Sequence, residues 1–250
     1  MSRSNESRLV LIVPAYNEEH RLGDGSYFRQ IQEQGSIRFI FVNDGSTDQT
    51  ASLLKNLCHQ VNGRVIDLEQ NSGKAEAIRQ GLLISLDEDS FEYVGFLDCD
   101  RAFSVDSVSD FIKKANIVLS TDKSIDAVIS SRIKLSGREV LRKASRHYIS
   151  RILITLIGFS VPNLPYDSQS GLKIFRKTTQ LEDALSRPFS TKWFFDIELF
   201  IRTNWLEENR VWEEPVISWV DIDGSHLNWK KFPGLLREIW TIIKIGRANR

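Results

Sequence analysis

The segment Tyr93-Val-Gly-Phe-Leu-Asp-Cys-Asp100 joins a short apolar run to two acidic residues at its end. A continuous apolar run is typical of a strand that is covered on both faces, as in a parallel sheet. Similar runs lie at residues 8–13, 37–42, 63–68 and 127–131. These runs predict the strands of one sheet, and the acidic pair marks the end of one of them.

Helical patterns fill the gaps between these strands. A cap at Thr47–Thr50 begins a helix that reaches about His59, and Gly73-Lys74 opens a second that runs through Leu86. Residues 104–120 have the periodicity of a third helix with one apolar face. The alternation predicts an α/β fold with a mostly parallel, Rossmann-like sheet flanked by helices and joined by right-handed crossovers.

The pattern changes after residue 138. Residues 1–138 hold 16 basic and 20 acidic residues, whereas residues 139–250 hold 17 basic and 13 acidic residues. An acidic front half and a basic back half suggest different tasks within one domain of 250 residues. In the back half we expect a basic amphipathic helix at 138–158, strands at 170–175 and 216–220, and helices at 189–205 and 235–247.

Composition restricts the class of protein. The formal net charge is zero, which gives no support to nucleic-acid binding. Cys58 and Cys99 are far apart, and the first residues lack the pattern of a signal peptide, so we expect a cytoplasmic protein. The longest apolar run, residues 152–161, is about half the ~20 residues that a membrane span needs.

Asp98 and Asp100 are the strongest candidates for a binding site. Ligands of open α/β sheets bind beyond the carboxyl ends of the strands, where these two residues are expected. Two carboxylates two positions apart can both bear on one hard cation, Mg²⁺ or Mn²⁺, which keeps room for substrate phosphates. The alternative is an acidic turn that binds nothing.

The other predicted strand ends supply further candidates. Asp44 follows a strand, and its carboxylate can accept hydrogen bonds from a base or a ribose. Pro14 ends the first strand, and Glu18 lies within reach of a ribose hydroxyl. Lys74 begins a helix, where a cation can approach a diphosphate, although the segment is not a Walker motif. Each residue also fits a turn, a cap or a solvated side chain.

The order and separation of these motifs resemble the family 2 glycosyltransferases, which share the GT-A fold. The motifs are Val13–Glu18, Val42–Asp48, Asn71–Lys74 and Asp98–Asp100. The back half resembles the dolichyl-phosphate glucosyltransferase and mannosyltransferase branch of that family. Its motifs are Ser131-Arg132, Tyr166–Phe175, Trp193–Glu198, Val216–Trp219 and Gly224–Leu227, so the resemblance covers roughly residues 8–240.

The resemblance implies an inverting transfer of a hexose from a UDP- or GDP-linked sugar donor. Residues 8–135 would be the nucleotide-sugar-binding half, and residues 136–250 the acceptor-binding extension of a GT-A-like domain. The resemblance assigns the nucleoside to Pro14, Ala15, Tyr16, Glu18 and Asp44, ribose or sugar to Asp98, the metal to Asp100, and the acceptor phosphate to Arg132 with a following basic residue.

This chain departs from the family at two positions. Ala102 stands where the mannosyltransferases often carry a further polar residue beside the metal. His226 stands where the family has a lysine, and histidine is a weaker, pH-sensitive cation.

The residues leave two classes of acceptor open. A hydroxyl acceptor needs a general base, for which Asp196 and Glu198 are candidates, unless one caps a helix and the other orients an arginine. A lipid phosphate is already an anion and needs only cations to hold it. Basic residues that suit phosphate follow the fifth strand, at Arg132, Arg138, Arg142, Lys143, Arg146 and Arg151.

Two amphipathic segments, residues 138–161 and 229–247, favour the lipid acceptor. Their basic and apolar residues predict peripheral contact with the cytoplasmic face of a membrane, with packing in the core as the alternative. Our preferred hypothesis is hexose transfer to a polyprenyl-type phosphate. The alternatives are transfer to a saccharide with Asp196 as base, and a nucleotide-sugar binding protein without turnover. A nucleotidyltransferase is disfavoured, because no glycine-rich loop follows the first strand.

Overall fold

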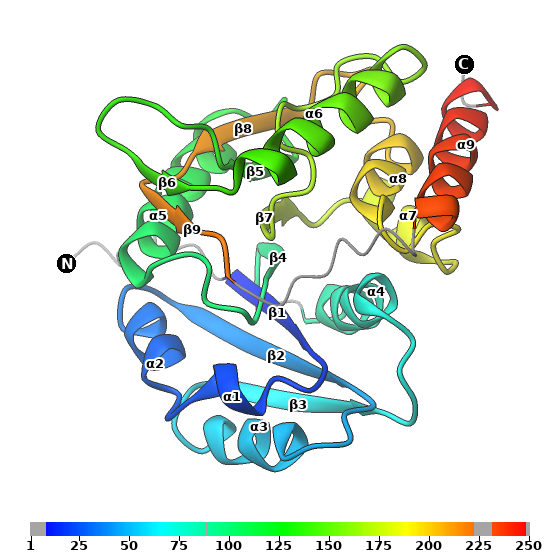
Figure 1. The fold of residues 1–250 in the computed structure, drawn as a ribbon. Coiled ribbons are helices and arrows are strands. Elements are labelled where there is room, and N and C mark those ends of the chain that lie inside the picture. The colour runs from blue at the N-terminus through cyan, green and yellow to red at the C-terminus, as the bar shows by residue number, and fades with distance from the viewer. Residues whose placement is uncertain (1–8, 89, 223–231, 249–250) are drawn as a thin grey trace.

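The computed structural model describes residues 9–88, 90–222 and 232–248, with the backbone alone at 144–147 and 232–233. Within these residues the main sheet has seven strands in the order β3-β2-β1-β4-β7-β5-β8 (Figure 1). The strands are β1 (Leu9–Ala15), β2 (Ile37–Asp44), β3 (Gly63–Leu68), β4 (Tyr93–Leu97), β5 (Ala127–Ser131), β7 (Leu172–Arg176) and β8 (Val211–Pro215).

All strands of the main sheet except β7 run parallel to one another. β1 pairs with β2 and β4, β2 pairs with β3, β5 pairs with β8, and β7 is antiparallel to both β4 and β5. Nearly every residue of β1 and β4 is buried, which explains their continuous apolar runs. Because parallel strands end at the same edge, the loops after Ala15, Asp44 and Leu97 lie together there.

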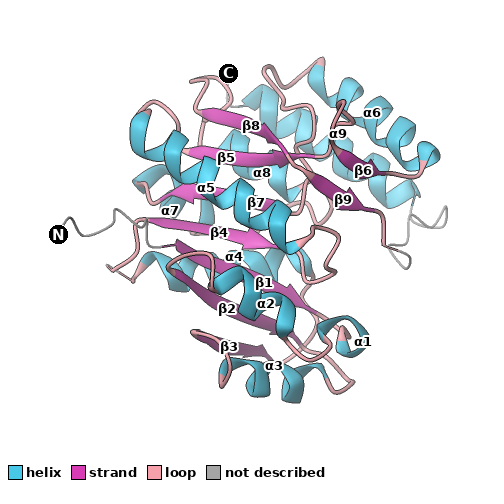
Figure 2. Ribbon diagram, turned by 90° about the vertical axis from the view of Figure 1, so that its left-hand side faces the viewer, coloured by secondary structure: helices cyan, strands magenta, loops and turns pink. Residues whose placement is uncertain are grey.

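Two layers of helices enclose the sheet, as Figure 2 shows. Leu9, Leu11 and Val13 share one hydrophobic core with α1 (Glu19–Leu22), α2 (Ser26–Gln32), α3 (Thr50–Cys58) and α5 (Val105–Thr121). Val10 and Ile12 share the other core with α4 (Lys74–Leu86), α6 (Ala144–Gly158), α7 (Thr179–Leu185), α8 (Phe195–Arg202) and α9 (Phe232–Ala248). The alternation along β1 follows from the two-residue period of a strand.

The predicted α/β fold is therefore confirmed, and the expected front strands match to within about two residues. The expected helix at 138–158 is wrong at its start. Glu139–Leu141 form strand β6, which pairs in parallel with β9 (Ser218–Val220), and helix α6 begins only at Ala144. Val140 and Trp219 are register partners and both are buried. The segment at residues 139–141 is therefore stabilised by pairing with a strand distant in sequence and not by the hydrogen bonds of a local helix.

Other parts of the back half also differ from expectation. The helix expected at 189–205 is shortened to α8, because the Glu198 carboxylate accepts hydrogen bonds from the Ser190 and Thr191 amides and holds them in a loop. Strand β8 and helices α1, α2 and α7 were not predicted. The motif Gly224–Leu227, with His226, lies outside the described residues. Among the helices that the structure describes, none combines the length and the hydrophobicity of a membrane span.

Candidate active site

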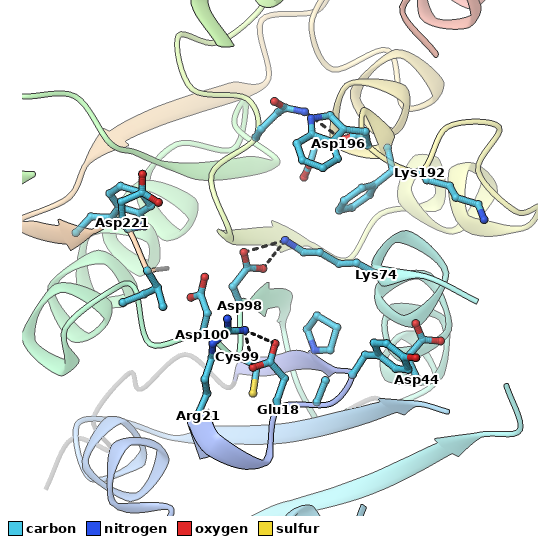
Figure 3. Close-up of a pocket in the computed structure, with 18 of the residues that line it drawn as sticks. Glu18, Arg21, Asp44, Lys74, Asp98, Cys99, Asp100, Lys192, Asp196 and Asp221 are labelled. Carbon is cyan, nitrogen blue, oxygen red and sulfur yellow. Dashed lines mark hydrogen bonds and ion pairs between the residues drawn. The ribbon is translucent and has the colours of Figure 1, made fainter. Parts of the chain in front are cut away.

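A cavity of about 460 Å³ lies beyond the carboxyl ends of β1, β2 and β4 (Figure 3). Its front wall consists of Pro14, Ala15, Tyr16, Glu18, Arg21, Asp44, Lys74, Asp98, Cys99 and Asp100. Its back wall consists of Arg132, Arg142, Ser150, Gln169, Lys192, Trp193, Phe195, Asp196, Trp219, Asp221 and Ile222. The cavity thus brings together all ten residues that the sequence and the family resemblance single out most strongly for the site, and both halves of the chain contribute to it.

Asp44 is buried and holds the loop that precedes helix α4. One carboxylate oxygen accepts a hydrogen bond from the Ser72 amide at 2.7 Å, and the other accepts one from the Gly73 amide at 2.8 Å. Gly45, next along the chain, has a φ of +66°, and a Cβ there would lie 2.5 Å from the Gln70 backbone. Asp44 therefore shapes the side of the cavity next to α4, and the contact with a nucleoside that the family resemblance implies stays a prediction.

Glu18 is one of the carboxylates of the front wall. Both of its carboxylate oxygens accept hydrogen bonds from one nitrogen of Arg21 at 2.9 Å, and its amide donates to the Thr50 hydroxyl at 2.8 Å. Burial raises the pKa of Glu18, and the Arg21 guanidinium offsets only part of that effect. Arg21 was missed by the sequence reasoning, although its spacing of three residues from Glu18 is a typical helical ion pair.

Asp98 and Asp100 both border the cavity, with the buried Cys99 between them. The Lys74 ammonium lies 2.6 Å and 2.8 Å from the two oxygens of Asp98. One oxygen of Asp100 accepts a hydrogen bond from the Ala102 amide at 3.0 Å. Burial, and then the negative charge of Asp98, raise the pKa of Asp100. This cost of holding two carboxylates close together is relieved when a cation binds between them.

The front wall fits a divalent cation if a ligand completes its coordination. Among the described residues, no group of three or more His, Cys, Asp or Glu side chains is placed to hold a metal ion. Asp98 and Asp100 therefore supply only part of a coordination shell. Mg²⁺ and Mn²⁺ commonly take one or two carboxylates and fill the remaining positions with water and substrate phosphates.

Asp196 and Glu198 play different parts, although both lie in the first turn of α8. Glu198 is fully buried, bonds the loop at residues 190–191 and forms an ion pair with Arg202 at 2.6 Å, so its role is structural. Asp196 borders the cavity and forms an ion pair at 2.7 Å with the fully buried Lys173. Burial raises the pKa of Asp196, although the charges of Lys173 and Lys74 oppose this.

Arg132 is already engaged by a carboxylate on the back wall. Two of its guanidinium nitrogens donate to the two oxygens of Asp167 at 2.6 Å, and the guanidinium stacks over the Trp219 ring at 5.1 Å. Burial acts to raise the pKa of Asp167, but Arg132 outweighs it and lowers the pKa to about 2. A phosphate contact by Arg132 would have to share the guanidinium with Asp167.

Arg142 and Lys192 are the back-wall cations without such a partner. Neither makes a hydrogen bond or ion pair with any residue in the described part of the chain, and both border the cavity. Burial, and then the charge of Arg132, lower the pKa of Arg142. Lys192 was missed by the sequence reasoning, although it directly precedes the motif at Trp193–Glu198. Gln169 and Trp193 lie within the motifs that carry the family resemblance but were not named as site residues, and Asp221 was missed.

The other members of the predicted basic cluster whose side chains the structure describes do not border the cavity. Arg151 donates to the Tyr166 carbonyl at 2.7 Å and stacks on the Tyr166 ring at 4.0 Å, so it supports the fold. Arg138 and Lys143 do not border the cavity, and the side chain of Arg146 lies outside the described part.

Comparison with known proteins agrees with this arrangement. The family model of glycosyl transferase family 2 matches residues 10–179. The chain is 30% identical over 240 residues to a dolichyl-phosphate beta-glucosyltransferase of Dictyostelium discoideum, covering 88% of this chain and 68% of that protein. It is 29% identical over 243 residues to the Homo sapiens dolichyl-phosphate beta-glucosyltransferase, covering 90% and 71%.

The fold is also that of a solved glycosyltransferase. Glucosyl-3-phosphoglycerate synthase from Mycobacterium tuberculosis, in complex with Mn²⁺, UDP-glucose and phosphoglyceric acid, superposes with a TM-score of 0.66 at 19% identity. The match covers 97% of this chain and 80% of that one. The sequence matches favour an enzyme over a binding protein without turnover. The chain belongs to glycosyl transferase family 2 and is a glycosyltransferase of the dolichyl-phosphate glycosyltransferase branch.

Proposed function

We propose that the protein transfers a hexose, with inversion, from a nucleoside diphosphate sugar to a polyprenyl-type lipid phosphate, using Mg²⁺ or Mn²⁺. The observation that carries the proposal is the distribution of charge around one cavity. Its front wall presents the carboxylates of Glu18, Asp98 and Asp100, and its back wall adds Arg142 and Lys192, which have no partner among the described residues. The first set suits a metal and a nucleotide, and the second suits an anionic acceptor.

The donor would lie against the front wall. Pro14, Ala15, Tyr16, Glu18 and Asp44 would contact the nucleoside, and Asp98 would face the ribose or the sugar. Asp100, with Asp98, would hold the metal, which when bound neutralises charge on the leaving nucleoside diphosphate. The printed names of the relatives specify glucose, and the structural neighbour was solved with UDP-glucose, so UDP-glucose is the first donor to test.

The acceptor would approach the back wall. A phosphate oxygen is already anionic and attacks without a general base, so the protein has to orient it and balance its charge. Arg142 and Lys192 would supply the positive charge that balances the phosphate. Arg132 would also contact the phosphate, while its guanidinium remains paired with Asp167. Both sequence relatives are named for a dolichyl-phosphate acceptor, which supports a lipid phosphate here.

The exposed faces of α6 and α9 support contact with a membrane surface. Tyr148, Ile152 and Leu156 recur along one side of α6 and are 66%, 61% and 47% exposed, and the C-cap residue Phe159 is 80% exposed. The opposite side of α6 packs into the core through Leu153 and Ile157, so core packing accounts for one face of this helix and the proposed membrane contact concerns the other. Such a stripe of large apolar side chains is typical of a helix that lies in a membrane interface.

Helix α9 extends this surface. It packs against α6 and exposes Leu236 and Trp240, which are 51% and 65% exposed. We name the six exposed residues the apolar stripe: Tyr148, Ile152, Leu156, Phe159, Leu236 and Trp240. Ser150 of α6 borders the cavity, so the stripe and the back wall share one helix.

Incubation with radiolabelled UDP-glucose or GDP-mannose, Mn²⁺ and a polyprenyl phosphate tests the proposal. We expect label in the organic phase, loss of that label with EDTA, and an inverted anomeric configuration in the product by NMR. Label that enters a soluble saccharide but never the lipid would overturn the acceptor assignment. It would favour the second candidate, in which Asp196 acts as general base, because the raised pKa of Asp196 suits proton transfer nearer to neutral pH.

A further inference from the structure

Lys74 occupies both oxygens of the carboxylate that the metal is expected to use. Its ammonium lies 2.6 Å and 2.8 Å from the two oxygens of Asp98. Lys74 is the first residue of α4, and its side chain is 45% exposed, so the long side chain has solvent into which it can move. The side chain of Asp98 is only 24% exposed, so it has less solvent-filled space into which it can move.

The backbone fixes Asp98 more firmly than it fixes the Lys74 ammonium. The Asp98 amide donates to the Gly171 carbonyl at 2.8 Å. A Cβ at Gly171 would lie 2.1 Å from a carboxylate oxygen of Asp98, so the carboxylate packs directly against a position that has no side chain. Of the two partners in the ion pair, the lysine is the one that can leave.

Lys74 and a divalent cation compete for the same negative charge. The protein supplies few ligands for a metal, because no group of three or more acidic, His or Cys side chains is placed to hold one among the described residues. A cation that bound alone would have to displace Lys74 from Asp98 and leave the charge of Lys74 next to the metal. The other carboxylates that act on Lys74 are Asp100, itself a proposed metal ligand, and Asp196, already paired with Lys173. Like charges at such short separation repel strongly in a partly buried site.

We propose that Lys74 is the internal counter-ion of Asp98 in the donor-free protein and couples metal binding to nucleotide binding. The diphosphate of the donor provides the anion to which Lys74 transfers, and this transfer frees Asp98 for the metal. Each ligand then strengthens the binding of the other by the same factor, because linkage is reciprocal. This coupling rests on the proposed metal-dependent donor site and adds that Lys74 moves from Asp98 to the diphosphate when the metal binds.

The affinity for Mn²⁺ alone separates this coupling from simple chelation. A diphosphate always helps to bind a metal, so synergy in the wild type is not sufficient evidence. We expect Lys74→Met to bind Mn²⁺ without nucleotide about tenfold more tightly than the wild type, within the range of ordinary coupling energies. We also expect UDP, or GDP in a separate series, to strengthen Mn²⁺ binding less in Lys74→Met than in the wild type.

Electron paramagnetic resonance of free Mn²⁺ measures these affinities without turnover. Lys74→Arg is the matched control, because it keeps the cation and should retain the weak binding of Mn²⁺ alone. Equal or weaker Mn²⁺ binding by Lys74→Met would overturn the coupling. Thermal unfolding should show that both variants fold, since the side chain is half-exposed.

Asp100→Ala distinguishes failure of the coupling from failure of the proposed function. If Asp100→Ala loses Mn²⁺ binding while Lys74→Met leaves it unchanged, the metal site is right and the coupling is wrong. If Asp100→Ala binds Mn²⁺ as the wild type does, the metal lies elsewhere, and both the coupling and the metal-dependent donor site are wrong.

Discussion

The two walls of the cavity hold their charges differently. On the front wall, two carboxylates are paired with basic residues of the same wall, Glu18 with Arg21 and Asp98 with Lys74. On the back wall, Arg132 is paired with Asp167 and Asp196 with Lys173, but Arg142 and Lys192 have no partner in the part of the chain that the structure describes. The front wall therefore has to exchange partners when ligands bind, whereas the back wall has cations ready for an anion.

This difference predicts that the front wall controls the chemistry and the back wall controls the acceptor. Residues of the front wall should affect every reaction of the donor, including its hydrolysis by water. Residues of the back wall should affect transfer to the lipid phosphate and leave donor binding and donor hydrolysis largely unchanged.

Asp100→Ala should have the largest effect. We expect turnover with Mn²⁺ to fall by roughly 10³-fold or more, since electrostatic stabilisation of the leaving group is usually the largest catalytic contribution. Both lipid glycosylation and donor hydrolysis should be lost. Asp87→Ala, which removes an exposed acid at the end of α4, is the matched control and should keep full turnover. Retained donor hydrolysis in Asp100→Ala would show that the front wall does not control the chemistry.

Gly171→Ala should have the next largest effect, although it adds only a methyl group. The new Cβ would lie 2.1 Å from the Asp98 carboxylate, so Asp98 must move. A displacement of about 1 Å in a reacting site can lower the rate by about 10²-fold, and we expect a loss of that order in turnover. Gly35→Ala is the control, because no atom lies within 4 Å of its added Cβ. Equal activity of the two variants would mean that the position of Asp98 does not matter.

The front wall could be predicted from the sequence because its signals are local. Each acid or lysine follows a strand or opens a helix, and the periods that reveal those elements extend over fewer than about 20 residues. The strand that precedes the acidic pair was predicted at residues 93–97, the bounds of β4, for this reason. The ion pair of Lys74 with Asp98 could not be predicted, because the two residues are 24 positions apart and meet only after β1, β2 and β4 align.

The back wall could be predicted only in part because its contacts are distant in sequence. Glu139–Leu141 form a strand with residues 218–220, and nothing in the local pattern distinguishes that strand from the start of a helix. Lys173 has the pattern of an ordinary strand residue, yet it is fully buried against Asp196. Gly171 shows its importance only once the Asp98 carboxylate lies against it.

Arg142→Ala tests the back wall directly. If Arg142 holds the acceptor phosphate, its removal should lower kcat/KM for the polyprenyl phosphate by about 10- to 100-fold, as expected for loss of one charge-assisted hydrogen bond. UDP binding and donor hydrolysis should stay unchanged. Arg138→Ala removes a nearby cation outside the cavity and serves as the control. An equal loss of donor hydrolysis would contradict the separation of the two walls.

The apolar stripe should have a smaller effect that depends on the membrane. Ile152→Ser with Phe159→Ser removes two large exposed side chains from α6. We expect binding to vesicles of phosphatidylcholine and phosphatidylserine to weaken by about tenfold, since the two side chains together contribute roughly 1.4 kcal/mol at an interface. Ile117→Ser changes an equally exposed residue of α5 and is the control. Unchanged vesicle binding in the double variant would remove the stripe as the membrane contact.

The remaining expected effect concerns stability, and its sign differs between Asp100 of the front wall and Asp167, the partner of the back-wall residue Arg132. On the front wall, burial and Asp98 raise the pKa of Asp100, so ionised Asp100 destabilises the fold at neutral pH and protonation relieves this. On the back wall, Arg132 overcomes burial and lowers the pKa of Asp167 to about 2, below its usual value of 3.8. Ionised Asp167 therefore stabilises the fold above about pH 4, and the contribution disappears as the pH falls through about 2.

Asp100→Asn and Asp167→Asn should consequently move the unfolding free energy in opposite directions. At pH 7 we expect Asp100→Asn to be more stable than the wild type by about 0.5–2 kcal/mol, the usual gain when a strained functional group is removed. Asp167→Asn should be less stable, and about 2 kcal/mol of its deficit should disappear between pH 5 and pH 2, as the pKa shift requires. Urea unfolding at several pH values measures both. A stability deficit of Asp167→Asn that stays constant with pH would show that the ion pair with Arg132 does not hold Asp167 ionised. A loss of stability in Asp100→Asn would mean that the protein already compensates the negative charge of Asp100 without a metal.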